Sequence, residues 1–236
     1  MPQELSILMI TAASLGFVHT LFGPDHYLPF IVMSKARGWS LAKTSWITGL
    51  CGLGHVLGSI VIGAIGILLG VGIQKLEIFE STRGNWAAWA FIFFGFIYML
   101  YGLWKARKNK PHAHQHLHDG YEHVHEHTHE KEHYHVHDNK KKPNLTPWIL
   151  FLIFVLGPCE PLIPVLMYPA AKNSVSGVVM VSVVFGIVTI ATMMTVVILA
   201  YKGFKFIPLK PVEKYIHAIA GGTILLSGCA IVFLGL

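Results

Sequence analysis

Six long apolar segments constrain the fold of this chain more than any other feature of its sequence. They lie near residues 5–32, 41–73, 85–105, 146–169, 175–201 and 212–235. A helix crosses the hydrocarbon core of a bilayer in roughly 20 residues, and each segment reaches that length. Because lipid offers no hydrogen bonds to an irregular backbone, these segments predict six transmembrane helices.

Composition supports a membrane protein and excludes other classes. Hydrophobic residues make up 53% of the 236 and charged residues 13%, and the mean hydropathy is +0.56. Soluble domains carry about 25% charged residues. The net charge of +6 is concentrated in short connections, which indicates contact with lipid headgroups rather than nucleic acid. We therefore expect an all-α protein integral to the cell (inner) membrane, with the lipid bilayer around it and no nucleic-acid partner.

A four-residue signature occurs twice, each time inside an apolar segment. The two copies are Gly23-Pro24-Asp25-His26 and Gly157-Pro158-Cys159-Glu160. A proline interrupts a helix, and ionisable side chains at membrane depth are costly. The signature therefore predicts that the first and fourth helices are broken and that a functional site lies at the breaks.

The two signatures also indicate an internal repeat. They lie 134 positions apart, and the same offset places Gly52 on Gly186 and His55 on Thr189. Three spans per half is an odd number, so the second half must cross the membrane in the opposite direction, as in the inverted repeats of secondary transporters. The predicted parts are a first three-helix repeat at 1–106, a histidine-rich cytoplasmic loop at 107–144 and a second three-helix repeat at 145–236.

The distribution of basic residues predicts the orientation. On one side of a six-span arrangement lie only Lys75, Arg83 and Lys172, and the remaining fifteen of the 18 Lys and Arg lie on the other side, with the central loop. Loops rich in Lys and Arg stay in the cytoplasm. We expect both termini outside and the central loop inside.

The central loop has an unusual composition. Between Pro111 and Lys142 it holds eleven histidines: His112, His114, His116, His118, His123, His125, His127, His129, His133, His135 and His137. With almost no aliphatic residues it cannot bury a core, so we expect it to be disordered without metal. Neutral imidazoles bind transition metals. The loop therefore predicts a metal-buffering segment rather than the translocation path.

Side chains near the two signatures predict a metal site. The expected ligands are Asp25, His26, His55, Cys159, Glu160 and His19, with Cys51 and Thr189 as possible additional ligands. Two carboxylates match the charge of a dication, imidazole supplies nitrogen, and cysteine can bind as thiolate. Mixed donors of this kind favour nickel, cobalt or zinc over magnesium and calcium.

Several of these residue types also have structural explanations. A histidine inside the membrane often only hydrogen-bonds a neighbouring helix, and this interpretation stays open for His19 and is favoured for His217. Cys51 and Cys229 are equally well explained as small buried hydrophobic residues.

The histidine motifs resemble those of a known family. His19 with Asp25 and His26, the stretch 52–55 and the histidine-rich loop are together similar to the nickel/cobalt transporter superfamily, including resistance exporters and urease-accessory or sulfite-exporter-like membrane proteins. The resemblance implies metal-ion transport and favours efflux. The stretch 157–161 looks more like the Pro-Cys helix breaks of thiol-redox membrane proteins in the same wider superfamily.

Three alternatives to metal transport follow from the residues. A transmembrane thiol-redox carrier would use Cys159, but it needs a second cysteine, and the equivalent position in the first half is Asp25; Cys51 is the remaining candidate. An exporter of sulfite-type anions would favour basic or neutral polar residues, whereas the expected site holds two acids. An enzyme has less support, because no general base is present beyond the ligands themselves.

The sequence thus predicts a secondary transporter and not an enzyme. Its substrate would be a divalent transition-metal ion (nickel, cobalt or zinc), no organic cofactor is expected, and the chain contains no Walker-type phosphate loop. Efflux coupled to proton exchange is expected, because such ligands release protons when they bind metal.

Overall fold

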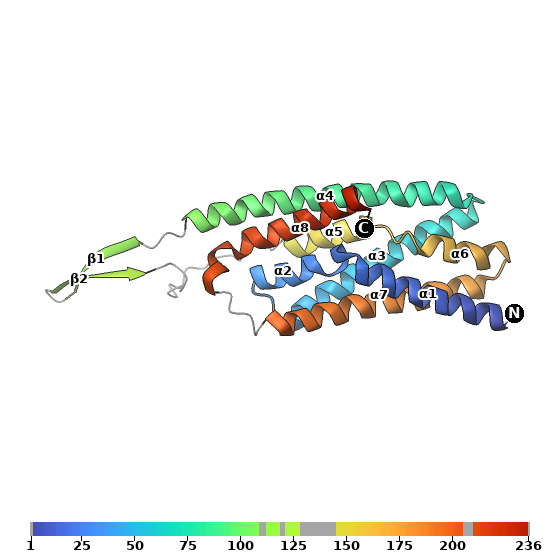
Figure 1. Cartoon of the computed structure of the whole chain (residues 1–236), viewed down its shortest axis with the longest axis horizontal. Helices are drawn as coiled ribbons and strands as arrows, with labels where there is room; N and C mark the ends of the chain where they lie inside the picture. The colour runs from blue at the N-terminus through green and yellow to red at the C-terminus, as the bar shows by residue number, and fades with distance from the viewer. Residues whose placement is uncertain (1, 109–111, 119–120, 128–144, 205–209, 236) are drawn as a thin grey trace.

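The computed structural model describes residues 2–108, 112–118, 121–127, 145–204 and 210–235 (Figure 1). The first half contains α1 (Pro2–Phe22), the 3-10 turn η1 (Pro24–His26), α2 (Leu28–Ala36), α3 (Leu41–Leu68) and α4 (Ile73–Lys108). The second half contains α5 (Thr146–Leu156), α6 (Leu162–Ala171), α7 (Val175–Gly203), the 3-10 segment η3 (Lys210–Tyr215) and α8 (Ile216–Leu234). A two-stranded hairpin, β1 (His112–His118) and β2 (Tyr121–His127), separates the halves.

The helices confirm an integral membrane protein whose apolar segments are all helical. Five of them are long and apolar enough to cross a membrane: Gln3–Phe22, Leu41–Leu68, Ile73–Lys108, Val175–Gly203 and Val212–Leu234. The shorter apolar helices α5 and α6 follow one another along the chain. The helix breaks predicted from the two signatures are present, since α1 and α2 are separated at Gly23-Pro24 and α5 and α6 at Gly157-Pro158.

The start of α4 differs from the sequence prediction. The expected third span began near residue 85 and left Arg83 in a loop, but α4 begins at Ile73 and Arg83 is only 9% exposed. The helix continues through this polar stretch because Arg83 pairs with Glu80, one turn earlier on the same helix. A charge that the sequence assigned to the surface therefore lies inside the protein.

The hairpin corrects the prediction for the central loop. The loop was expected to be disordered, but its described part forms two antiparallel strands whose register sets His114 opposite His125 and His116 opposite His123. The alternation of histidine with other residues has the period of two that a strand requires. The predicted metal-buffering residues His129, His133, His135 and His137 lie outside the described residues.

Helices α4 and α8 lie side by side along most of their length (Figure 1). Gly95 of α4 faces Gly221 of α8, Gly102 of α4 lies against Ala218, and Gly228 of α8 lies against Ala88. A Cβ atom at any of these four glycines would collide with the opposing backbone. Small residues at this spacing let membrane helices approach closely. This seam joins the last helices of the two halves.

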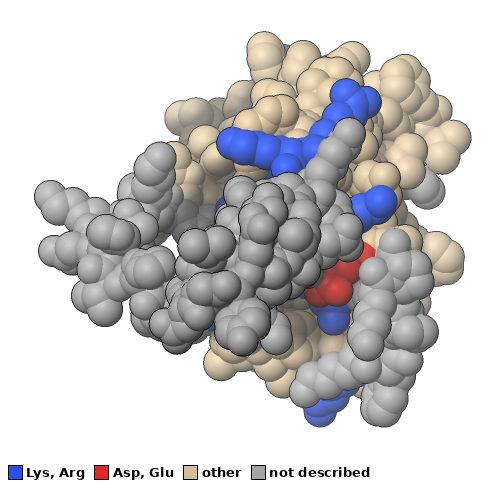
Figure 2. All heavy atoms as spheres, turned by 90° about the vertical axis from the view of Figure 1, so that its left-hand side faces the viewer, with Lys and Arg blue, Asp and Glu red and all other residues tan. Residues whose placement is uncertain are grey.

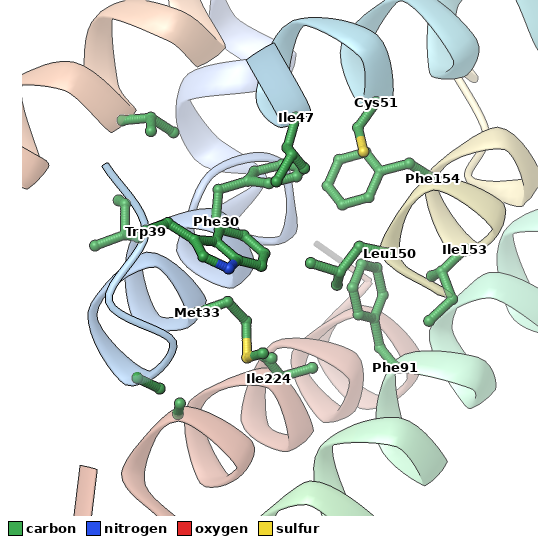
Figure 3. Close-up of a cluster of buried hydrophobic side chains, with 14 of the residues drawn as sticks. Phe30, Met33, Trp39, Ile47, Cys51, Phe91, Leu150, Ile153, Phe154 and Ile224 are labelled. Carbon is green, nitrogen blue, oxygen red and sulfur yellow. The ribbon is translucent and has the colours of Figure 1, made fainter. Parts of the chain in front are cut away.

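The inner ends of the broken helices meet in one hydrophobic cluster (Figure 3). Phe30 of α2 and Phe154 of α5 lie with ring centroids 4.6 Å apart, and Phe91 of α4 packs on the same ring of Phe154. A second cluster, around Cys159 and Leu162, packs α6 against α1 and α7. Both helix breaks therefore lie in the packed interior.

Candidate functional site

The first break holds His26 rigidly against its own backbone. Helix α1 stops before Pro24, and the ring nitrogen Nδ1 of His26 lies 3.1 Å from the Gly23 carbonyl oxygen and 3.3 Å from Asp25 Oδ1. A Cβ atom on Gly23 would lie 2.5 Å from that nitrogen, so only glycine fits at this position. The break thus orients the imidazole with groups from within its own turn.

Three histidines meet at this point. His19 from α1, His26 from η1 and His55 from α3 each offer a ring nitrogen, and the three nitrogens lie within 4.8 Å of one another. His26 Nε2 and His55 Nε2 are 3.3 Å apart. His26 and His55 are buried, and His19 Nε2 is buried without a hydrogen-bond partner among the described residues. We call His19, His26 and His55 the histidine triad.

The hydrogen bonds of the triad determine where its protons are. His26 Nδ1 faces the carbonyl of Gly23, and His55 Nδ1 faces the carbonyl of Phe154 at 3.4 Å. A carbonyl only accepts, so each Nδ1 carries the hydrogen, and in a neutral ring Nε2 is then an acceptor. With both rings in this tautomer, a proton or a metal ion between the two nitrogens, 3.3 Å apart, would relieve the repulsion of the facing lone pairs.

The spacing of the two Nε2 atoms suits a metal. Ligand nitrogens lie about 2.0–2.1 Å from zinc, and two of them in a tetrahedral site are separated by about 3.3 Å. The Nδ1 bonds to oxygen acceptors resemble the outer partners that orient metal-bound imidazoles. The triad can therefore hold a proton or a borderline transition-metal ion.

The second break is satisfied by side chains from other helices. Pro158 and Pro161 lack an N–H, so the carbonyls of Phe154 and Gly157, four residues earlier, lose their helical donors. His55 Nδ1 reaches the Phe154 oxygen, and the guanidinium of Arg83 donates to the Gly157 oxygen at 3.1 Å. Helices α3 and α4 thus complete the hydrogen bonding of α5.

A buried polar network continues from Arg83 to the backbone of Cys159. Arg83 pairs with Glu80 at 2.8 Å, Ser59 of α3 donates to the same Glu80 oxygen at 2.9 Å, and the Cys159 N–H donates to Ser59 Oγ at 3.0 Å. Glu80 is fully buried. The sequence analysis did not predict this network of Glu80, Arg83 and Ser59. The spacing of Glu80 and Arg83, three residues apart in a stretch without proline, could have indicated an ion pair on one face of a helix.

The structure gathers some of the predicted ligands and separates others. Asp25 and the triad come together at the first break, whereas Glu160, expected in the same cage, is exposed and lines a pocket of about 550 Å³ with Glu77 and Ser81. The turn that buries Cys159 carries the next side chain outward. The single cage of acids, imidazoles and sulfur that the sequence suggested is therefore divided into two regions.

The remaining candidates have separate positions. Cys159 is fully buried in the turn between α5 and α6, and Cys51, one helical turn before His55, packs against Phe154 as a hydrophobic residue (Figure 3). Thr189 is buried beside α1, and its Oγ1 has no partner within the described part of the chain. All three cysteines are free.

The family of the chain follows from its match to one family model. The model of the cytochrome C biogenesis protein transmembrane region matches residues 29–230. The chain belongs to this family. No curated protein and no solved structure matches it.

Membership in this family corrects the resemblance to the nickel/cobalt transporter superfamily, which was wrong. The motif that carried most of that resemblance, His19 with Asp25 and His26, precedes the matched residues, whereas the break at Gly157 to Pro161 lies within them. The match favours the thiol-redox alternative over metal-ion transport.

Proposed function

We propose that the protein carries reducing equivalents across the membrane by thiol–disulfide exchange at Cys159. Its family is that of the cytochrome C biogenesis protein transmembrane region. The observation that carries the proposal is the position of Cys159: it lies in the unwound turn of a broken helix, and its backbone is hydrogen-bonded to the network of Ser59, Glu80 and Arg83. A thiolate is the nucleophile in such exchange.

The exchange proceeds in three balanced steps. The Cys159 thiolate attacks one sulfur of a disulfide in a partner molecule, the S–S bond breaks, and one partner sulfur leaves as a thiolate that takes up a proton. A donor thiol from the other side then attacks the Cys159 sulfur of the mixed disulfide, and the second partner sulfur leaves as a thiol. A second donor thiol attacks the donor sulfur now bound to Cys159, which forms the donor disulfide and returns Cys159 to its thiolate. The two co-reactants are thus a disulfide on one side of the membrane and a thiol on the other.

The positions of the cysteines explain why both co-reactants come from outside the chain. Ser59, which holds the Cys159 backbone, lies two helical turns beyond Cys51 on α3, a rise of about 12 Å. A disulfide requires Cα atoms within roughly 7 Å. Cys51 also belongs to the hydrophobic cluster around Phe154, whereas Cys159 belongs to the other cluster.

Proteoliposomes test this function. Vesicles that contain the protein and a trapped aromatic disulfide are exposed to external glutathione, and the coloured thiolate released inside is measured. Cys159→Ser should abolish the protein-dependent rate of thiolate release. The matched control Cys229→Ser, near the C-terminal end of α8, should keep that rate. A folded and inserted Cys159→Ser protein that keeps the wild-type rate would overturn the proposal.

Cation binding by the histidine triad is a second candidate function, favoured by the facing nitrogens of His26 and His55. A divalent transition-metal ion bound there would lie between the two breaks, and movement of the broken helices would expose it to one side or the other. Metal analysis of purified protein lacking residues 112–137 tests this reading. His26→Gln and His55→Gln should each lose the bound zinc, and Cys229→Ser should keep it. Equal zinc content in all three would exclude the triad as a metal site.

We further infer that the two halves form a 3+3 inverted repeat of six transmembrane units. The supporting observation is direction: α1 and α2 run toward the hairpin end of the molecule, whereas α5 and α6 run away from it (Figure 1). The excess of Lys and Arg at the hairpin end supports a cytoplasmic hairpin and external termini. A reporter enzyme fused within the loop should be active only in the cytoplasm, and activity on the outside would reverse this orientation.

A further inference from the structure

A groove on the surface of α4 lies near the hairpin end of the molecule. Its volume is about 230 Å³, and it is lined by Arg37, Phe94, Ile97, Tyr98 and Tyr101. The four residues of α4 recur at spacings of three and four, so they form one stripe along the helix. Ile97 is 65% exposed and Tyr101 40%, so the stripe is open toward the surrounding lipid.

Arg37 lines this groove with a positive charge. It follows α2, donates one hydrogen bond to Thr146 Oγ1 at 2.9 Å, and lies over the ring of Tyr98 at 5.3 Å. A guanidinium carries five N–H donors, so several remain for a ligand. In the part of the chain that the structure describes, no carboxylate forms an ion pair with Arg37.

A second cation lies on the other side of Tyr98. The Tyr98 hydroxyl is 2.8 Å from His217 Nδ1, and the Lys105 ammonium donates to His217 Nε2 at 2.9 Å. Because an ammonium only donates, Nε2 is an acceptor and the imidazole of His217 is neutral. Lys105 therefore also lacks a negative partner within the described ranges.

The surroundings of the groove are those of the lipid headgroup level. Tyr101, Trp104 and Trp148 are exposed at this end, and amphipathic aromatic residues gather where the membrane meets water. Figure 2, which faces the hairpin end, shows lysine and arginine side chains on this end of the molecule. An apolar stripe here leads from the headgroup level toward the hydrocarbon core.

We propose that this groove binds an anionic phospholipid. Its phosphate is held by Arg37 and Lys105, and one acyl chain lies along Phe94 and Ile97. Two unpaired cations beside an apolar stripe match a ligand that carries one negative charge at its head and a hydrocarbon tail, and basic pockets between membrane helices recognise such headgroups. The site is separate from the two helix breaks and does not depend on the proposed redox function.

Native mass spectrometry of the purified full-length protein tests the proposal, with phosphatidylglycerol and phosphatidylcholine of the same chain length. Wild type should bind phosphatidylglycerol at least tenfold more tightly. Arg37→Gln and Lys105→Gln should each weaken that binding by about tenfold, since each removes a charge-assisted hydrogen bond. The matched control is Lys43→Gln, which removes an exposed charge near the start of α3, at the same end of the molecule. It should leave the affinity for phosphatidylglycerol unchanged.

Three results would overturn the assignment. The first is equal affinity for the two lipids. The second is an equal loss in the Lys43 variant, which would indicate only general surface charge. The third is an equal rise in the unfolding temperature with glycerol phosphate and with the lipid, which would indicate that the ligand is a soluble phosphate. If Arg37→Gln fails to fold because its bond to Thr146 is lost, Lys105→Gln decides the outcome.

Discussion

The two helix breaks have related sequences but different supports. At the first break, the Gly23 carbonyl is bound by the backbone and ring of His26, three residues later. At the second break, the Gly157 carbonyl is bound by Arg83 of α4, and the Phe154 carbonyl accepts from the Gly157 N–H and from His55 of α3. The backbone bonds of the first break are internal, whereas those of the second depend partly on neighbouring helices.

This difference indicates which break can move. A turn whose hydrogen bonds are internal can shift as a unit without exposing backbone groups to lipid, and each exposed group would be costly. The second break cannot move unless α3 and α4 follow it or the bonds from Arg83 and Ser59 are replaced. We therefore expect the first break to be the mobile element and the second to be the anchor.

Removal of Arg83 should break this comparison most strongly. Arg83→Met leaves the carboxylate of Glu80 buried without its cation and the Gly157 carbonyl without its donor, a loss of about 3–5 kcal/mol. The unfolding temperature in detergent measures it. The control Lys172→Met removes an exposed ion pair with Glu4 and should cause no measurable change. Similar behaviour of the two variants would show that the second break is not anchored by α4.

Removal of the Ser59 hydroxyl should have an intermediate effect. Ser59→Ala deletes the acceptor for the Cys159 N–H and a donor to Glu80, so about 1–3 kcal/mol should be lost. Cys159 should also react faster with a small maleimide, because its turn is held less firmly. Ser227→Ala, which removes a buried hydroxyl bonded only within its own helix, is the matched control. An unchanged maleimide rate in Ser59→Ala would contradict the anchoring role.

A methyl group at the first break should cost no more stability than the Ser59 change, and its effect should fall locally on the triad. In Gly23→Ala the new Cβ displaces the His26 ring, and we expect a loss of about 1–3 kcal/mol together with weaker zinc binding. Gly49→Ala, where a Cβ meets no neighbour, should be neutral or slightly stabilising. Unchanged zinc affinity in Gly23→Ala would mean that the orientation of His26 does not depend on the tight turn.

The sequence was a good guide wherever the signal was local. Proline and glycine inside apolar segments predicted both breaks. The same reasoning placed Arg83 in a loop. A charged residue near the end of an apolar segment is expected to face solvent, unless its buried partner, here Glu80, is known. The family was also misjudged, since histidine motifs of this kind are not specific to metal transporters, and one of them, His19 with Asp25 and His26, precedes the matched residues.

What the sequence alone determined is the set of helices, the positions of their breaks and the presence of imidazole and thiol groups beside them, because hydrophobicity and proline act along the chain. Only the tertiary structure decided that His19, His26 and His55 share one point while Glu160 turns outward and Cys51 lies apart from Cys159. The physical reason is that a membrane helix has several faces, and packing against other helices selects the face that turns inward. The same packing brought Glu80, Arg83 and Ser59 to the second break, where Arg83 donates to the Gly157 carbonyl that Pro161 leaves without its helical donor and Ser59 accepts from the Cys159 N–H.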